Sequence, residues 1–163
     1  MTVLVTAASK HGATYEIAEA LVRELRSRDV DAEVMGLDEV VDPAAYEAVL
    51  LGSGVYLGRW LEEARDFVDR HEATLAARPV WLFSSGPLGD PPKPAPDKAV
   101  EIEEILSKTG AREHHLFTGR LDKSKLGLGE RTIARAVHVQ EGDFRDWNEV
   151  SAWAGHVAAA LKG

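Results

Sequence analysis

The sequence contains no cysteine, which excludes disulfides, thiolate metal sites, iron–sulfur clusters and cysteine nucleophiles. It also lacks a basic excess, because 19 lysines and arginines stand against 27 acidic residues for a net charge of −8. Nucleic acid is therefore not an expected partner. No uncharged stretch approaches the ~18 apolar residues of a membrane-spanning helix, and the start Met-Thr-Val-Leu-Val has no secretory-signal character. We expect a cytoplasmic protein.

Several catalytic signatures are missing as well. The six histidines are scattered and show no His-Glu-x-x-His spacing, so no catalytic metal site is expected. No Gly-x-Ser-x-Gly turn is present, which removes the usual hydrolase nucleophile. No Gly-Lys-Ser/Thr ending marks a nucleoside-triphosphate loop. Hydrolase and triphosphatase functions are therefore disfavoured.

What the sequence does contain is a regular alternation of apolar runs and amphipathic segments. Its 163 residues are 45% apolar and 28% charged, which predicts one folded domain over residues 1–163. Short apolar runs predict strands, and apolar residues at three- and four-residue steps predict helices. The predicted strands lie near residues 3–7, 32–35, 48–51, 80–83 and 115–118, and the predicted helices near 17–25, 61–75, 97–108 and 150–161.

This alternation indicates how the strands pair. Strand, helix and strand units join parallel neighbours by right-handed crossovers, so we expect an open α/β sheet with helices on both faces. The solid apolar run 48–51 predicts a central strand, and the alternating run 32–35 predicts an edge strand. Ligands of such sheets bind outside the carboxyl ends of the strands, which directs attention to the loops 8–14, 52–60 and 84–96.

The first of these loops reads Ser9-Lys10-His11-Gly12-Ala13-Thr14. Backbone N–H groups at a helix start, with two hydroxyls and a glycine, can cradle a phosphate. A plain turn in which Ser9 or Thr14 caps the helix explains the same residues. The sequence leaves both interpretations open. It also leaves open whether Lys10 pairs with a phosphate or faces solvent.

The second and third loops carry features that suit a flat ring. The second offers close backbone approach and aromatic side chains, from Gly54, Val55, Tyr56, Leu57 and Trp60. Trp60 fits equally well as a core residue at the start of the next helix. The third offers hydroxyls and N–H groups to the polar edge of a heterocycle, from Ser84, Ser85, Gly86, Pro87, Leu88 and Gly89. We expect the three loops to converge in one crevice.

The residues 6–14, the order of elements and the aromatic-bearing second loop together resemble a flavodoxin-type FMN domain. More narrowly, the segment 119–147, with its ending Gly142-Asp143-Phe144-Arg145-Asp146-Trp147, is similar to the branch of the bacterial menaquinone-dependent protoporphyrinogen oxidases. The resemblance covers nearly the whole chain and implies a five-stranded parallel sheet in the order 2-1-3-4-5. The sequence departs from the family at Lys10 and His11, in a loop that is usually uncharged, and at Leu88, where an aromatic residue often stands.

The resemblance implies FMN as the cofactor, with its phosphate on Ser9 to Thr14 and its ring between the second and third loops. The flavin then performs the transfer of electrons or hydride, so no catalytic side chain is required. The implied partners are a small molecule such as protoporphyrinogen, a quinone or a redox protein, and a homo-oligomer is compatible with this. The alternatives are a flavodoxin-type electron carrier and a flavin-free binding module on the same fold.

One segment is positively charged although the chain as a whole is negatively charged. Residues 120–138 carry five basic and two acidic side chains, so they are +3 within a chain of −8. Such a segment can attract carboxylates of a substrate or anionic lipid headgroups, which would make the protein membrane-peripheral. A solvated loop and helix face is the alternative interpretation.

Overall fold

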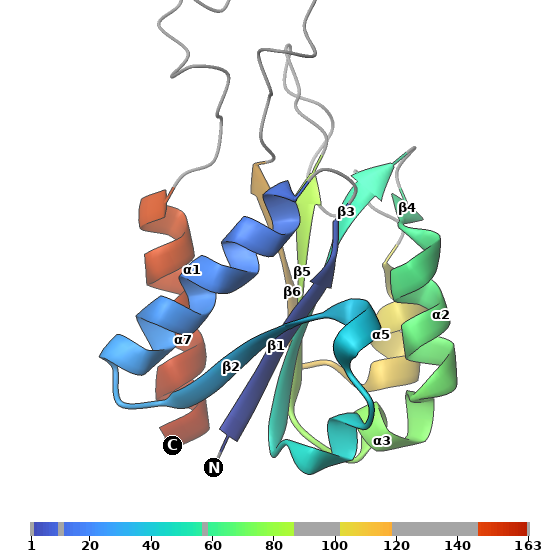
Figure 1. Ribbon diagram of the computed structural model, residues 1–163, viewed down its shortest axis with the longest axis horizontal. Helices are drawn as coiled ribbons and strands as arrows, with labels where there is room; N and C mark the ends of the chain where they lie inside the picture. The colour runs from blue at the N-terminus through green and yellow to red at the C-terminus, as the bar shows by residue number, and fades with distance from the viewer. Residues whose placement is uncertain (1, 10–11, 57–58, 87–101, 119–146, 163) are drawn as a thin grey trace, which may run out of the picture.

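The computed structural model describes residues 2–9, 12–56, 59–86, 102–118 and 147–162 (Figure 1). Its strands are β1 (Thr2–Ala8), β2 (Asp31–Gly36), β3 (Ala48–Tyr56), β4 (Arg59–Trp60), β5 (Val80–Gly86) and β6 (Glu113–Thr118). Its helices are α1 (Ala13–Ser27), α2 (Glu62–Arg70), α3 (Glu72–Ala76), α5 (Glu103–Thr109) and α7 (Trp147–Lys162). Two short 3-10 turns, η1 (Leu37–Glu39) and η2 (Pro43–Ala45), connect β2 to β3.

The sheet has the predicted topology. Five strands pair in parallel in the order β2-β1-β3-β5-β6, which confirms the order 2-1-3-4-5 when the parallel strands are counted along the chain. The predictions of β2 at an edge and β3 in the centre are confirmed too. The strands run in one direction, so their carboxyl ends meet at a single edge, the upper one in Figure 1.

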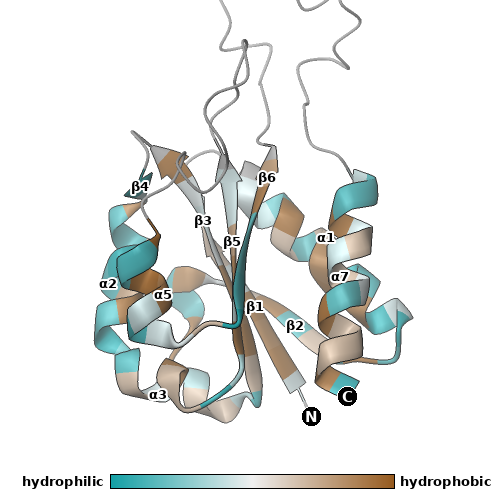
Figure 2. Ribbon diagram, turned by 180° about the vertical axis from the view of Figure 1, so that it is seen from behind, coloured by the Kyte–Doolittle hydropathy of each residue, from teal (hydrophilic) through white to brown (hydrophobic). Residues whose placement is uncertain are grey.

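The sheet separates two apolar cores. Helices α1 and α7 cover one face, and α2, α3 and α5 cover the other (Figure 1). Side chains alternate along β3, with Leu50 in the core under α1 and α7 and both Val49 and Leu51 in the core under α2 and α5. The brown, apolar strands between teal helix surfaces in Figure 2 show the same layering. This burial on both faces explains why β3 and β5 read as solid apolar runs.

Three details differ from the sequence prediction. The predicted helix 61–75 is two helices, α2 and α3, because His71 between them leaves helical geometry (φ −119°, ψ 22°). A sixth, two-residue strand, β4, runs antiparallel to the end of β3. Within the described residues the last helix before β6 begins at Glu103, and residues 97–101 of the predicted helix lie outside them.

No helix among the described residues combines the length and the apolar character needed to cross a bilayer.

Candidate functional site

The three predicted loops leave the sheet side by side. In the strand register Ala8 of β1 is next to Ser53 of β3, and Ser53 is next to Ser84 of β5. One step further along, Gly54 is paired with Ser85. The loops that follow these strands therefore start from adjacent points of the carboxyl edge, which is where parallel α/β sheets bind ligands.

The first loop forms an open turn at the start of α1. Gly12, the residue that caps the helix, has a φ of 85°, a left-handed conformation that favours glycine. A Cβ atom built on Gly12 would meet no atom within 4 Å beyond its chain neighbours, so the space on that side of Gly12 is open. Ser9 Oγ accepts a hydrogen bond from the N–H of Thr14 at 3.1 Å. This is the capping role that one interpretation of the loop predicted, and a hydroxyl that accepts can still donate its own proton to a ligand.

Thr14 connects this turn to the end of β3. Its side chain is 2% exposed, and a Cβ atom on Gly54 would lie 3.3 Å from Thr14 Oγ1. The hydroxyl of Ser53 donates to the carbonyl of Gly54 at 2.7 Å and accepts from the N–H of Leu61 at 3.0 Å. The stems of the first and second loops are thus packed together, and the close approach at Gly54 leaves little room for a side chain.

Trp60 lies in the core rather than at the mouth of a crevice. Its side chain is 1% exposed, and its indole N–H donates to Ser84 Oγ at 2.7 Å. Of the two interpretations left open for Trp60, the structure therefore supports the core residue. It places Trp60 in β4, immediately before α2, rather than within the helix. Ser84 is fully buried, so its hydroxyl faces Trp60 and not the edge of the sheet.

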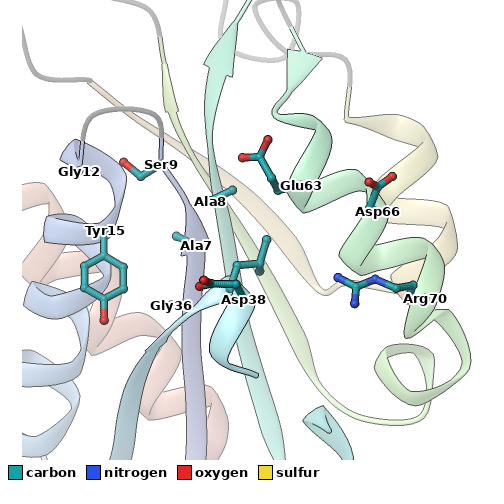
Figure 3. A pocket seen from close by; sticks show the side chains of 11 residues that line it. Ala7, Ala8, Ser9, Gly12, Tyr15, Gly36, Asp38, Glu63, Asp66 and Arg70 are labelled. Atoms are coloured by element: carbon teal, nitrogen blue, oxygen red, sulfur yellow. The ribbon is translucent and has the colours of Figure 1, made fainter. Parts of the chain in front are cut away.

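A cleft of about 620 Å³ opens beside the first loop (Figure 3). Figure 3 shows Ser9 and Gly12 on one side of it and side chains of α2 on the other. The lining residues are Ala7, Ala8, Ser9, Gly12, Tyr15, Gly36, Leu37, Asp38, Glu63, Asp66 and Arg70. Of the predicted site residues that the structure describes, Ser9 and Gly12 reach this cleft, whereas those of β3 and β5 do not line it.

The α2 side of the cleft is acidic. Glu63 and Asp66 of α2 lie there, Asp38 of η1 adds a third carboxylate to the lining, and Arg70 of α2 is the one basic residue among the described lining residues. Across the cleft, burial raises the pKa of Tyr15, and the nearby carboxylates of Glu19 and Glu39 raise it further, so its phenol stays protonated at neutral pH. An anion in this region is therefore repelled from the α2 side and attracted by the N-terminus of α1.

These acidic residues were missed from sequence, where Glu63 reads as part of a solvated helix face. The order of the elements along the chain could have indicated these acidic residues. Helix α2 starts directly after β3 and β4, so its first turn lies at the same carboxyl edge as the three loops. Asp38 follows the end of β2 in the same way.

The other predicted site residues are placed only in part. Val55 lies in β3, Ala13 begins α1, Tyr56 ends β3 and Gly86 ends β5. The remaining ones fall outside the described residues, namely Lys10, His11, Leu57, Pro87, Leu88 and Gly89. The basic segment 120–138 lies outside them too. Among the described residues, no group of three or more acidic or histidine side chains is arranged to hold a metal ion.

Comparison with known proteins decides the family, because the family described as Flavodoxin domain matches residues 4–148. The chain belongs to the flavodoxin domain family. Flavodoxins are FMN-binding proteins, which confirms FMN as the cofactor that the sequence resemblance implied. A full-length relative is the Protoporphyrinogen IX dehydrogenase [quinone] of Escherichia coli strain K12. It is 22% identical over 172 residues, which cover 97% of this chain and 95% of the relative.

Solved structures show the same fold at low identity. An archaeal flavodoxin superposes with a TM-score of 0.65 at 22% identity and full coverage of both chains. A mutant flavodoxin from Pseudomonas aeruginosa gives 0.60 at 22% identity, again with full coverage of both. The rubredoxin oxygen:oxidoreductase of Desulfovibrio gigas gives 0.63 at 14% identity, and there the match covers 99% of this flavodoxin domain and 36% of that chain.

Proposed function

We propose that the protein is a redox protein that binds FMN across the carboxyl ends of β1, β3 and β5. The observation that carries this proposal is the turn at Gly12, which is left-handed, has open space where a Cβ atom would lie and is placed at the N-terminus of a 15-residue helix. The positive end of a helix dipole and its free N–H groups favour a phosphate dianion. The residues present therefore fit the phosphate end of the cofactor.

Each of the three loops has a proposed role in FMN binding. Ser9, Gly12 and Thr14, with the intervening Lys10, His11 and Ala13, hold the phosphate. The ring lies between the second loop, from Gly54 to Leu57, and the third loop, from Ser85 to Gly89. Bound FMN supplies the transfer of electrons or hydride, while the protein orients the ring and sets its surroundings. Trp60 and Ser84 support these loops from inside the core.

For the reaction, we propose oxidation of a porphyrinogen with a quinone as acceptor. The support is the relative from Escherichia coli, whose name states that chemistry and whose length this chain matches almost completely. The alternative is an electron carrier that docks on a redox protein, which the flavodoxin structures favour. An assay with protoporphyrinogen and menaquinone separates the two, because only the enzyme produces fluorescent porphyrin in proportion to quinone reduced.

The cofactor itself is tested by mild purification. We expect a yellow protein that releases one FMN per chain on denaturation and rebinds FMN afterwards. A colourless protein that does not respond to added FMN would contradict the proposal and favour a flavin-free binding module on this fold.

A further inference from the structure

Three side chains from three strands, β4, β5 and β6, form a hydrogen-bonded chain. The indole N–H of Trp60 in β4 donates to Ser84 Oγ in β5 at 2.7 Å, and Ser84 Oγ lies 2.6 Å from Nε2 of His114 in β6. Trp60 and Ser84 are buried. Three partners so far apart in sequence are thereby fixed relative to one another.

The chemistry of the three groups determines which atom donates and which atom accepts in each hydrogen bond. An indole N–H can only donate, so it occupies one lone pair of Ser84 Oγ. The Ser84 proton then needs an acceptor, and Nε2 of His114 is the one that the described residues provide. His114 must therefore carry its own proton on Nδ1 and stay neutral. This agrees with burial, which together with His115 lowers the pKa of His114 to about 4.

Two of the three hydrogen-bonded side chains, Trp60 and Ser84, belong to the predicted second and third loops. Trp60 ends β4 and is the last residue of the second loop, 52–60, whereas Ser84 is the first residue of the third loop, 84–96, and lies two residues before the end of β5. A second contact fixes the same region, because Ser53 Oγ accepts from the N–H of Leu61, the next residue after Trp60. Hydrogen bonds between buried groups, such as that of Trp60 with Ser84, hold their members in one geometry.

We infer that Ser84 and His114 are positioning residues of the flavin site, which fix the strand ends from which the second and third loops start. The inference rests on the proposed function: it adds His114 and gives Ser84 a supporting role in place of the ligand contact predicted from sequence, and neither residue lines the cleft. Binding sites lose affinity when the groups that support them are displaced by about 1 Å. Removing the hydrogen bond between Ser84 and His114 should therefore weaken FMN binding even when the protein remains folded.

The test compares four variants by FMN titration, with urea unfolding to verify that each is folded. Ser84→Ala and His114→Leu remove the link, and we expect the FMN Kd to rise about tenfold for each. His114→Gln keeps an acceptor near the position of Nε2 and should restore near-native affinity. Thr109→Val is the matched control, because Thr109 is also a fully buried hydroxyl with two hydrogen bonds, to Ile105 and Ala111, at the amino edge of the sheet. It should lower stability and leave the FMN Kd unchanged.

The inference is overturned if Ser84→Ala and His114→Leu bind FMN like the wild type. It is overturned equally if Thr109→Val weakens binding as much as Ser84→Ala, because the effect would then follow global stability. Amide exchange in the FMN-free proteins gives a reading that is independent of the proposed function. Faster exchange at Gly54, Val55 and Leu61 in Ser84→Ala than in Thr109→Val supports the inference, and equal rates contradict it. A wild type that binds no FMN would instead refute the proposed function.

Discussion

The two faces of the sheet are built in different ways. Under α1 and α7, Phe83, Phe117 and Trp153 pack edge to face with ring centroids 5.6 to 6.3 Å apart. Under α2 and α5 the core is mainly aliphatic, and it contains the polar chain through Ser84. The first face contains a cluster of three aromatic rings, and the second contains a hydrogen-bonded pair of buried polar groups, Trp60 and Ser84.

The contacts at the edges of the sheet also differ between the two faces. Helix α7 is joined to β6 by a hydrogen bond from the Trp153 indole to Glu113 at 2.6 Å and by a contact of 2.5 Å between His115 and Glu149. On the other face the β2–β3 connection consists of η1 and η2, and the cleft opens beside η1. The comparison teaches that the aromatic packing lies on the α1 and α7 face, whereas the cleft lies between α2 and the N-terminal turn of α1 and so draws on helices of both faces.

The largest effect is expected from Gly52→Ala. A Cβ atom at Gly52 would lie 2.3 to 2.6 Å from ring atoms of Phe83, so the aromatic core must shift. We expect a loss of about 3 kcal/mol of unfolding free energy, measured by urea denaturation. Gly54→Ala is the matched change two residues later on the same face of β3, at the carboxyl edge where the second loop starts. It should cost less than ~1 kcal/mol and weaken FMN binding. Equal stability losses in the two variants would contradict the tighter packing at Gly52 than at Gly54.

The next effect is a pH dependence that arises from His114. Its pKa in the folded protein is about 4, against 6.5 in the unfolded chain, so the unfolded state binds more protons between these values. The folded state keeps its full stability above pH 6.5 and loses up to about 3 kcal/mol as the pH falls to 4, less where water screens the ring. His114→Gln should lack this component, which appears as the difference between the two stability curves. Curves that stay parallel from pH 6.5 to 4 would show that His114 is not buried as a neutral ring.

A smaller effect is expected at the phosphate turn. Ser9→Ala removes a hydroxyl that caps α1 and can donate to a phosphate oxygen. We expect the FMN Kd to rise about tenfold and the Kd of riboflavin, which has no phosphate, to stay unchanged. A parallel loss for both ligands would mean that Ser9 supports the fold and not the phosphate.

The smallest effect concerns the acidic side of the cleft. Glu63→Gln removes one carboxylate that faces the first loop, so the phosphate should be repelled less. FMN affinity should increase about two- to threefold at low salt and return toward the wild-type value at high salt. Glu72→Gln in α3, which does not line the cleft, is the control with the same charge change. An equal gain in both variants would indicate a general charge effect.

Much of this architecture could be predicted from the sequence, because apolar runs such as 48–51 and 80–83 directly report burial on both faces. The strand order followed from the family resemblance and the positions of the three loops from the strand ends. The break at His71 was not predictable, since Phe67 and Leu75 continue one apolar stripe across both helices. The role of Trp60 was undecided for a similar reason. Its partner Ser84 is 24 residues away, and no local pattern reveals a hydrogen bond of that kind.

Local sequence patterns also do not reveal which residues line the cleft. Glu63 and Asp66 have the spacing of an ordinary solvated helix face, and their relation to Ser9 appears only when α2 is placed beside β1. Short-range spacing thus predicts elements and the ends of strands, while the side chains that meet across elements require the fold.

The most direct test of the central claim is the ratio of the riboflavin Kd to the FMN Kd of the wild-type protein, measured by flavin fluorescence at constant ionic strength. The phosphate differs between the two ligands and the ring does not. If the turn at Gly12 holds the phosphate, FMN should bind at least about 100-fold more tightly, which corresponds to roughly 2.7 kcal/mol. Equal affinities for the two flavins would contradict the account.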